Sequence, residues 1–236
     1  MAIQTAVLTK KTQLTNDVIE FSFETKDRFE FQAGQFISIK ITDNQPSPCI
    51  RGYSIASAPN KNSNKFTLCV KIIENGRGSN WLNALKQGDE IQFLGPNGKF
   101  FPGENLTEVS LFIATGTGIA PLKAIIEDQL LNKNTKTKLH LIFGVRYIKD
   151  IFYENIFKNL AEKFQNFTYE ITISRPENPD WKGNIGRVTA ILKNLQIDPE
   201  NTQAYLCGLK DMLDETTLML EAKGLSPENI HKEQFD

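Results

Sequence analysis

Cysteine is scarce in this sequence, and its scarcity excludes two classes of protein. The 236 residues include only Cys49, Cys69 and Cys207. Three cysteines are too few for a disulfide framework, and their wide separation does not match the close spacing of zinc or iron–sulfur ligands. We therefore expect no metal site, and any cofactor should be organic.

Net charge and long apolar runs are also lacking. With 27 basic and 28 acidic residues the net charge is -1, and no basic block alternates with aromatic residues, so we expect no nucleic-acid partner. No apolar run approaches the length that spans a membrane, and Met1–Thr5 lacks the features of a signal peptide. These absences predict a cytoplasmic protein without a membrane partner.

The first hundred residues have the pattern of an antiparallel sheet. Apolar and polar residues alternate in stretches such as Val18–Phe23, Phe36–Ile41 and Phe66–Ile73, and turn residues separate these stretches at short intervals. A barrel would close the edges of such a sheet. We predict an antiparallel β-barrel over residues 1–101.

The pattern changes near residue 102 to strands that alternate with helical segments. The stretches Leu139–Phe143, Tyr169–Ile173 and Ala204–Cys207 are further predicted strands. This alternation is typical of a parallel sheet covered by helices. We predict a Rossmann-like α/β domain over residues 102–236, which gives the chain two domains.

A glycine-containing loop directly follows the apolar run Val109–Ile113. Its glycines would let the backbone approach a diphosphate, its threonines would add hydroxyl donors, and a proline suits the first helical turn. Proline stands where the third glycine of the common G-x-G-x-x-G pattern would be, so an ordinary strand-to-helix turn is the alternative. The residues predicted to bind a dinucleotide are Thr115, Gly116, Thr117, Gly118 and Pro121.

A second cluster lies within the predicted barrel at Arg51–Ser57. Alternation places Arg51 and Tyr53 on the same side of a strand, where the arginine can bind a pyrophosphate and the ring can stack on a heterocycle. Ser54 can bond to a ring edge. A flavin nucleotide offers all three targets, and the alternative is a strand with a surface arginine and a half-buried tyrosine.

The glycine-rich segment Asn75–Leu82 ends a strand and opens a helix. Ser79 is the expected N-cap, and the helix start would be a second anion site. Taken by itself, such a segment is most often only a turn.

Six motifs in this order resemble the ferredoxin–NADP reductase family. They are Arg51–Ser54, Cys69–Lys71, Gly78–Asn80, Gly95–Gly98, Thr115–Pro121 and Cys207–Met212. The resemblance covers essentially the whole chain. It implies FAD in the barrel and NADP(H), or alternatively NAD(H), in the α/β domain.

The resemblance also implies roles for individual residues. Ser54 would lie near flavin N5, with Cys207 under the nicotinamide and Glu233 beside it, and these three are the predicted catalytic residues. The predicted FAD-binding residues are Arg51, Gly52, Tyr53, Ser54, Cys69, Val70, Lys71, Gly76, Gly78 and Ser79. Plant enzymes tend to have cysteine in place of Gly78, which should leave phosphate binding intact because a backbone amide makes that contact.

Further predicted cofactor-binding residues follow the last strand and end the chain. They are Gly208, Leu209, Met212 and Phe235. Phe235 would cover the flavin where plant enzymes have a terminal tyrosine. Since Asp236 follows it here, the cover could pack differently and admit nicotinamide more easily.

The choice of coenzyme depends on cations at the ends of the second and third strands of the α/β domain. Arg146, Ser174 and Arg175 match the adenosine-site motifs of the family, and Arg187 could supply a third cation. Three arginines and no acidic residue at the second strand end favour NADPH. However, NADH-using relatives also carry Ser-Arg and Gly-Arg at these positions.

The resemblance implies hydride transfer from NADPH to flavin N5, with electrons passed on singly. No cluster-binding cysteines are present, so a ferredoxin or flavodoxin is the expected partner, and one copy of the chain should suffice. The alternative is an NADH-dependent flavin reductase or the reductase component of a multicomponent oxygenase. A flavin-binding scaffold without turnover is a third interpretation, but the motifs at Ser54, Cys207 and Thr115–Pro121 are intact.

Overall fold

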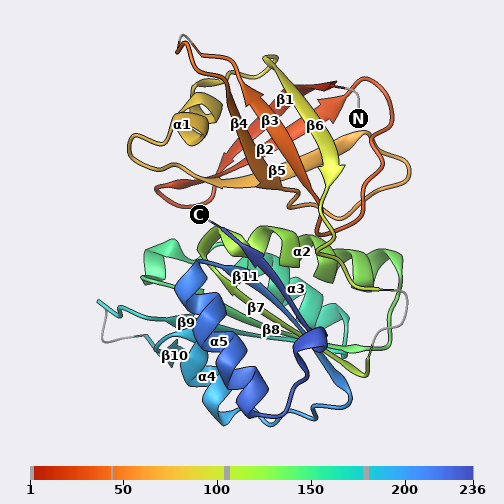
Figure 1. Ribbon diagram of the computed structural model, residues 1–236, viewed down its shortest axis with the longest axis vertical. Coiled ribbons are helices and arrows are strands. Elements are labelled where there is room, and N and C mark those ends of the chain that lie inside the picture. Colours follow the sequence, from red (N-terminus) through yellow and green to blue (C-terminus); the bar gives the residue numbers. More distant parts are fainter. Residues whose placement is uncertain (1–2, 44, 104–106, 178–180, 236) are drawn as a thin grey trace.

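The computed structural model describes residues 3–43, 45–103, 107–177 and 181–235. Its first half is an antiparallel sheet in the strand order β4-β3-β6-β1-β2-β5 (Figure 1). The strands are β1 (Gln4–Gln13), β2 (Val18–Thr25), β3 (Phe36–Ile41), β4 (Cys49–Ser54), β5 (Lys65–Lys71) and β6 (Glu90–Asn97). Helix α1 (Arg77–Ala84) connects β5 to β6.

The two outer strands of this sheet meet and close it into the predicted barrel. Ile55, directly after β4, forms an antiparallel bridge with Leu68 of β5. The Ala56 amide also donates to the Thr67 carbonyl over 2.8 Å. Alternate side chains point inward, and phenylalanines from β2, β5 and β6 fill the interior, among them Phe23, Phe66 and Phe93.

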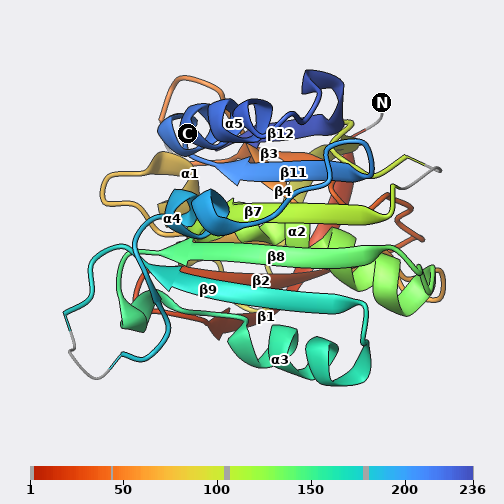
Figure 2. The same ribbon diagram turned by 90° about the horizontal axis from the view of Figure 1, so that it is seen from below.

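The second half is a parallel sheet in the order β10-β9-β8-β7-β11-β12, as predicted (Figure 2). The strands are β7 (Val109–Thr115), β8 (Lys138–Val145), β9 (Phe167–Ile173), β10 (Asn184–Ile185), β11 (Thr202–Gly208) and β12 (Ile230–Gln234). The helices are α2 (Ile119–Glu127), α3 (Glu154–Lys163), α4 (Val188–Asn194) and α5 (Lys210–Ala222). Helices α2 and α3 pack on one face of the sheet, and α4 and α5 pack on the other.

Helix α2 lies between the parallel sheet and the barrel (Figure 1). One apolar cluster joins its residues Ala120 and Ala124 to Val18, Ala56 and Cys69 of the barrel. The two halves of the molecule therefore share a buried contact. The predicted domain boundary between residues 101 and 102 falls in the connection from β6 to β7 and stays a prediction.

One local prediction is wrong. Ser79 is not the N-cap of α1, because the helix already begins at Arg77 and Gly76 is the cap residue. The Ser79 hydroxyl instead donates to the Gly76 carbonyl and accepts from the Ile73 amide, both over 3.2 Å. Extended backbone at Gly76 allows the helix to start three residues earlier than expected.

In the described ranges, none of the helices is both long and apolar enough to cross a membrane. The three cysteines are buried and none forms a disulfide.

Candidate active site

The predicted flavin cluster comes together at the start of α1. Gly78 lies against the side chains of Arg51 and Tyr53, since a Cβ atom at residue 78 would stand 2.6 Å from the Tyr53 hydroxyl oxygen and 3.0 Å from Arg51 Cγ. Arg51 and Tyr53 are thus on the same side of β4, as alternation predicts. Glycine at this position leaves room for Tyr53 in its present place.

These residues fit an FAD. Arg51 is exposed, and the only hydrogen bond of its side chain in the described part of the chain is made to the neighbouring Ile50 carbonyl over 2.9 Å. Burial raises the pKa of Tyr53 to about 12, so its hydroxyl stays protonated and the side chain is neutral. Amides of the first turn of α1 lack helical partners, and the Arg51 side chain lies against this turn at Gly78. A pyrophosphate and a flat ring system would meet complementary groups here.

The neighbouring Arg77, which the sequence analysis did not single out, has a structural role. Its guanidinium makes an ion pair with Asp43 over 2.6 Å and donates to the Ser47 carbonyl over 2.7 Å. Arg77 lowers the pKa of the Asp43 carboxyl, mainly through the hydrogen bond between the two side chains. The pair fastens the connection between β3 and β4 to α1, next to Arg51.

The side chains of the segment Cys69–Lys71 are engaged within the protein. Cys69 and Val70 are buried, the first at the contact between the two halves and the second in the barrel core. Lys71 makes an ion pair with Asp17 over 3.0 Å. A role for these residues in FAD binding stays a prediction.

The three predicted catalytic residues converge between the two halves of the molecule. The Ser54 hydroxyl donates to Glu233 Oε1 over 2.6 Å, although 179 positions separate the residues. Strand β12 places Glu233 there by pairing in parallel with β11, and in that register Glu233 lies beside Cys207. Ser54 therefore lies at the end of β4 and faces the end of β11 that carries Cys207.

Burial determines the protonation of this group. It raises the pKa of Glu233, and the bond from Ser54 opposes the shift only in part. Burial also raises the pKa of the Cys207 thiol well above its usual value, and the Glu233 charge adds to this effect. Cys207 is thus a neutral thiol, which suits contact with a planar ring and not nucleophilic attack.

The dinucleotide loop packs directly on the Cys207–Gly208 pair. A Cβ atom at Gly118 would stand 2.6 Å from the Cys207 carbonyl carbon, and one at Gly208 would stand 2.5 Å from Met212 Cε. Gly116 has a φ of +53°, a conformation that glycine adopts readily. Helix α2 begins at Ile119, so Pro121 lies in its first turn as predicted.

Phe235 follows β12 and lies next to this pair. Its amide donates to the Gly208 carbonyl over 2.9 Å, and its half-buried ring packs against the apolar cluster that joins the two halves. Asp236 lies outside the described residues. A covering role for Phe235 stays a prediction.

The predicted adenosine-site residues gather at the carboxyl ends of β8 and β9. The Arg175 amide donates to the Arg146 carbonyl over 2.8 Å, and both residues are exposed. Arg187 lies nearby at the start of α4, because the preceding Gly186 donates to Ile173 at the end of β9. Its guanidinium makes an ion pair with Glu215 of α5 over 2.7 Å, a partner that the sequence analysis did not foresee.

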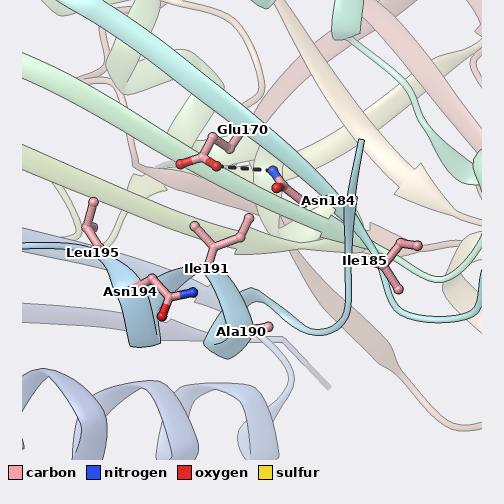
Figure 3. Close-up of a pocket in the computed structure, with 7 residues that line it drawn as sticks. All are labelled: Glu170, Asn184, Ile185, Ala190, Ile191, Asn194 and Leu195. Carbon is pink, nitrogen blue, oxygen red and sulfur yellow. Dashed lines mark hydrogen bonds between the residues drawn. The ribbon is translucent and has the colours of Figure 1, made fainter. Parts of the chain in front are cut away.

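A cavity of about 390 Å³ lies elsewhere, between α4 and strands β9 and β10 (Figure 3). Asn184 donates to Glu170 at its rim over 3.1 Å. The lining residues are Glu170, Asn184, Ile185, Ala190, Ile191, Asn194 and Leu195. None of them belongs to the predicted nucleotide sites, so we assign this cavity no part in the reaction.

The raised pKa of Glu233 predicts that Glu233→Gln does not reduce stability at neutral pH. The folded protein binds the proton of the Glu233 carboxyl more tightly than the unfolded chain does. The favourable contribution of this proton to the free energy of unfolding is therefore complete below the ordinary glutamate pKa. It is lost as the pH rises through the pKa of Glu233 in the folded protein. The charged carboxylate therefore costs stability at neutral pH, and glutamine does not.

Thermal unfolding of both proteins at neutral pH and below the ordinary glutamate pKa checks this prediction. We expect the variant to unfold at an equal or higher temperature at neutral pH and to lose this advantage in acid. A variant that is less stable at neutral pH than in acid, relative to the unmodified protein, would contradict it.

The fold and the site together define a class of protein. A barrel with a flavin cluster, joined to a parallel α/β domain with a dinucleotide loop, is the arrangement of flavoprotein oxidoreductases that use a nicotinamide coenzyme. Two family models agree with this class. An oxidoreductase FAD-binding domain matches residues 5–101, and an oxidoreductase NAD-binding domain matches residues 112–217.

Relatives of known sequence narrow the class to one family. Ferredoxin–NADP reductase B of Sorangium cellulosum is 33% identical over 231 residues, which cover 93% of this chain and 92% of the relative. The chain therefore belongs to the ferredoxin–NADP reductase family. This membership and the domain models confirm the predicted cofactors, FAD and a nicotinamide dinucleotide.

Other relatives have different roles. One component of the Na⁺-translocating NADH-quinone reductase of Psychrobacter cryohalolentis is 30% identical over 227 residues, and these cover 90% of this chain. They cover 55% of that component, so the chain spans about half the length of this relative.

Solved structures share the fold over nearly the whole chain. The ferredoxin NADP⁺ reductase of Neisseria gonorrhoeae with bound FAD and NADP has a TM-score of 0.85 at 23% identity, with 99% of each chain covered. The FAD/NAD-binding domain of nitric oxide dioxygenase from Vibrio cholerae O1 biovar El Tor has a TM-score of 0.86 at 25% identity, with 98% of each covered. The predicted fold class is thus confirmed.

Proposed function

We propose that the protein transfers electrons between NADPH and a one-electron carrier, ferredoxin or flavodoxin, through bound FAD. The observation that carries the proposal is the meeting of Ser54, Cys207 and Glu233 between the flavin cluster and the dinucleotide loop. The similarity to a ferredoxin–NADP reductase over almost the full length of both chains supports the choice of partner.

In this proposal, Arg51, Tyr53 and the first turn of α1 hold the FAD. Bound FAD supplies acceptance of a hydride at N5 and release of the electrons one at a time. The loop Thr115–Gly118 and the start of α2 hold the diphosphate of the dinucleotide. The chain contributes mainly by placing the two nucleotides against each other, because hydride transfer needs close contact and not a strong acid or base.

Ser54 and Glu233 line the place where the two nucleotides would meet. The hydroxyl proton of Ser54 points to Glu233 Oε1, so the orientation of the hydroxyl is fixed before either nucleotide arrives. Cys207 is a buried neutral thiol, and the side chains of Thr115 and Met212 cover Gly208, so a nicotinamide ring would contact this pair only after neighbouring side chains move. Phe235 at the end of β12 would exclude water until nicotinamide replaces it.

The arginines at the ends of β8 and β9 support NADPH as the coenzyme. Arg146 and Arg175 are exposed, held side by side through their backbones, and able to bind a 2′-phosphate with charge-assisted hydrogen bonds. Within the described residues, no ion pair engages either guanidinium.

Arg146→Ala and Arg175→Ala should each lower kcat/KM for NADPH by about tenfold, because each removes one charged contact to the phosphate. The value for NADH, which lacks that phosphate, should change by less than about twofold. Arg28→Ala serves as the control, since it removes an exposed arginine from the barrel. Equal losses with both coenzymes would contradict the assignment.

The ion pair between Arg187 and Glu215 favours a second candidate, an NADH-dependent reductase that serves an oxygenase or reduces free flavin. A guanidinium held by a carboxylate is less available to a phosphate. The relation to a component of an NADH-quinone reductase supports this alternative. The ratio of kcat/KM for NADPH to that for NADH separates the two candidates.

Further proposals concern the setting of the protein. One copy of the chain is sufficient in this proposal, because Ser54, Cys207 and Glu233 all come from the same chain. The cytoplasmic location and the extents of the two domains, residues 1–101 and 102–236, remain proposals from the sequence.

A further inference from the structure

A buried lysine of α2 links the two halves of the molecule. Lys123 is only 5% exposed, and its ammonium donates to the Ala56 carbonyl of the barrel over 3.0 Å. It also pairs with Glu127 of its own helix over 3.0 Å. A buried charge is costly unless it is paired and hydrogen-bonded. The ammonium of Lys123 meets both conditions through Glu127 and the Ala56 carbonyl.

Tyr153 makes a second link between the two halves of the molecule. It is 8% exposed and lies just before α3, and its hydroxyl donates to Glu20 Oε2 on β2 over 2.5 Å. Its φ of +61° is unusual for a bulky residue and unfavourable, so the surrounding contacts must hold it. The ammonium of Lys123 lies 5.0 Å from the Tyr153 ring centre and joins the two links.

A third link extends the contact along the same segment of the barrel. Helix α2 continues into a single π-helical turn, Asp128–Asn132. The Asn132 amide donates to the Pro59 carbonyl over 2.8 Å and to Asp128 over 2.8 Å. We name the side chains of Glu20, Lys123, Asn132 and Tyr153 the interdomain clamp.

The interdomain clamp contacts the parts of the chain that carry the two proposed nucleotide sites. Ala56 is two residues beyond Ser54, and the helix that supplies Lys123 begins at the dinucleotide loop Gly116–Gly118. A shift of α2 against the segment from Ala56 to Pro59 would therefore move that loop relative to Ser54. A displacement near 1 Å at a reacting centre can lower a rate by about 100-fold.

We infer that the interdomain clamp is a positioning device for hydride transfer, which fixes the distance between the flavin site at Ser54 and the nicotinamide site at Cys207. None of its residues is among those predicted to bind a nucleotide, and they act through α2 and the segment from Ala56 to Pro59. The inference rests on the proposed function in one respect, that hydride passes between two bound nucleotides.

The test uses the FAD-loaded variant Tyr153→Phe/Asn132→Ala, which removes two links and leaves Lys123 paired with Glu127. Replacing Lys123 itself would leave Glu127 without its partner and endanger folding. The matched control is Tyr169→Phe/Asn166→Ala. Asn166 also donates two amide hydrogen bonds, but to Thr135 and Thr137 within its own half.

At saturating NADPH we expect the clamp variant to reduce its flavin about tenfold more slowly, with the Kd for NADPH changed by less than about twofold. The control should keep its rate even where its thermal stability falls equally. Hydrogen exchange of the flavin-free proteins gives a readout independent of activity. The amides of Ala56, Ser57 and Ala58 should exchange faster in the clamp variant than in the unmodified protein or the control.

An unchanged rate, or equal slowing in the control, would overturn the inference, as would unchanged exchange of the Ala56, Ser57 and Ala58 amides. The proposed function fails by a different result, namely flavin in the unmodified protein that neither NADPH nor NADH reduces. If only NADH reduces it, the same comparison is made with NADH.

Discussion

Ser54→Ala is expected to slow reduction of the bound flavin by about 100-fold while the protein still takes up FAD. The substitution removes a hydroxyl from the point where the nucleotide sites meet, and it leaves the half-buried Glu233 without the donor that lies 2.6 Å away. A carboxylate that loses its partner in a buried place reorients or takes up a proton. Anaerobic stopped-flow measurement of the flavin band gives the rate constant.

Ser110→Ala is the matched control for this prediction. Ser110 is also a buried serine, but it lies near the start of β7, and its hydroxyl has no hydrogen-bond partner among the residues that the structure describes. Its removal should leave the rate of flavin reduction unchanged. A Ser54→Ala variant that reduces its flavin as fast as this control would show that Ser54 has no part in the transfer.

Gly118→Ala should disrupt the dinucleotide site and also lower stability. The added Cβ atom would lie 2.6 Å from the Cys207 carbonyl carbon and 3.0 Å from the Gly208 amide nitrogen. These are backbone atoms of β11 and cannot move aside as a flexible side chain can. Overpacking of this kind costs about 1–3 kcal/mol, which corresponds to a fall in Tm of about 3–10 °C.

The same change should slow flavin reduction at least about tenfold, because the loop and the Cys207–Gly208 pair are forced apart. FAD uptake should persist, since the barrel is untouched. Gly103→Ala is the control, as a Cβ atom there meets nothing within 4 Å. Normal Tm and normal reduction in Gly118→Ala would contradict the close packing of the loop on β11.

The architecture of both halves could be predicted because it depends on local patterns. Alternating apolar residues in Phe36–Ile41 predict β3 with its observed bounds, and the strand–glycine–helix order around Gly116 predicts β7, the loop and α2. The closing bridge between Ile55 and Leu68 is a long-range contact, yet it follows from the need to satisfy the edges of the sheet.

The contacts that assemble the site could not be predicted from local patterns. Strand β12 (Ile230–Gln234) is short and mostly polar, so only its pairing with β11 makes it a strand. The resemblance to a family pointed to Glu233, but nothing near it in the sequence indicates a bond to Ser54. Likewise, Lys123 resembles a solvated lysine in a helix until the barrel covers it.

Charged partners on neighbouring helices show the same limit. The motif around Arg187 indicates a cation near the adenosine site, but its pairing with Glu215 depends on how α5 lies beside α4. A carboxylate partner makes the guanidinium less available to bind a phosphate. The choice between NADPH and NADH therefore needs the tertiary structure and a direct measurement.

Anaerobic reduction of the FAD-loaded protein tests the central claim most directly. NADPH and, separately, NADH are added without oxygen, and bleaching of the flavin band is followed before oxidised ferredoxin is supplied. We expect rapid bleaching by NADPH, slower bleaching by NADH, and return of the band with ferredoxin. A protein that takes up no FAD, or whose flavin neither coenzyme bleaches, would contradict it.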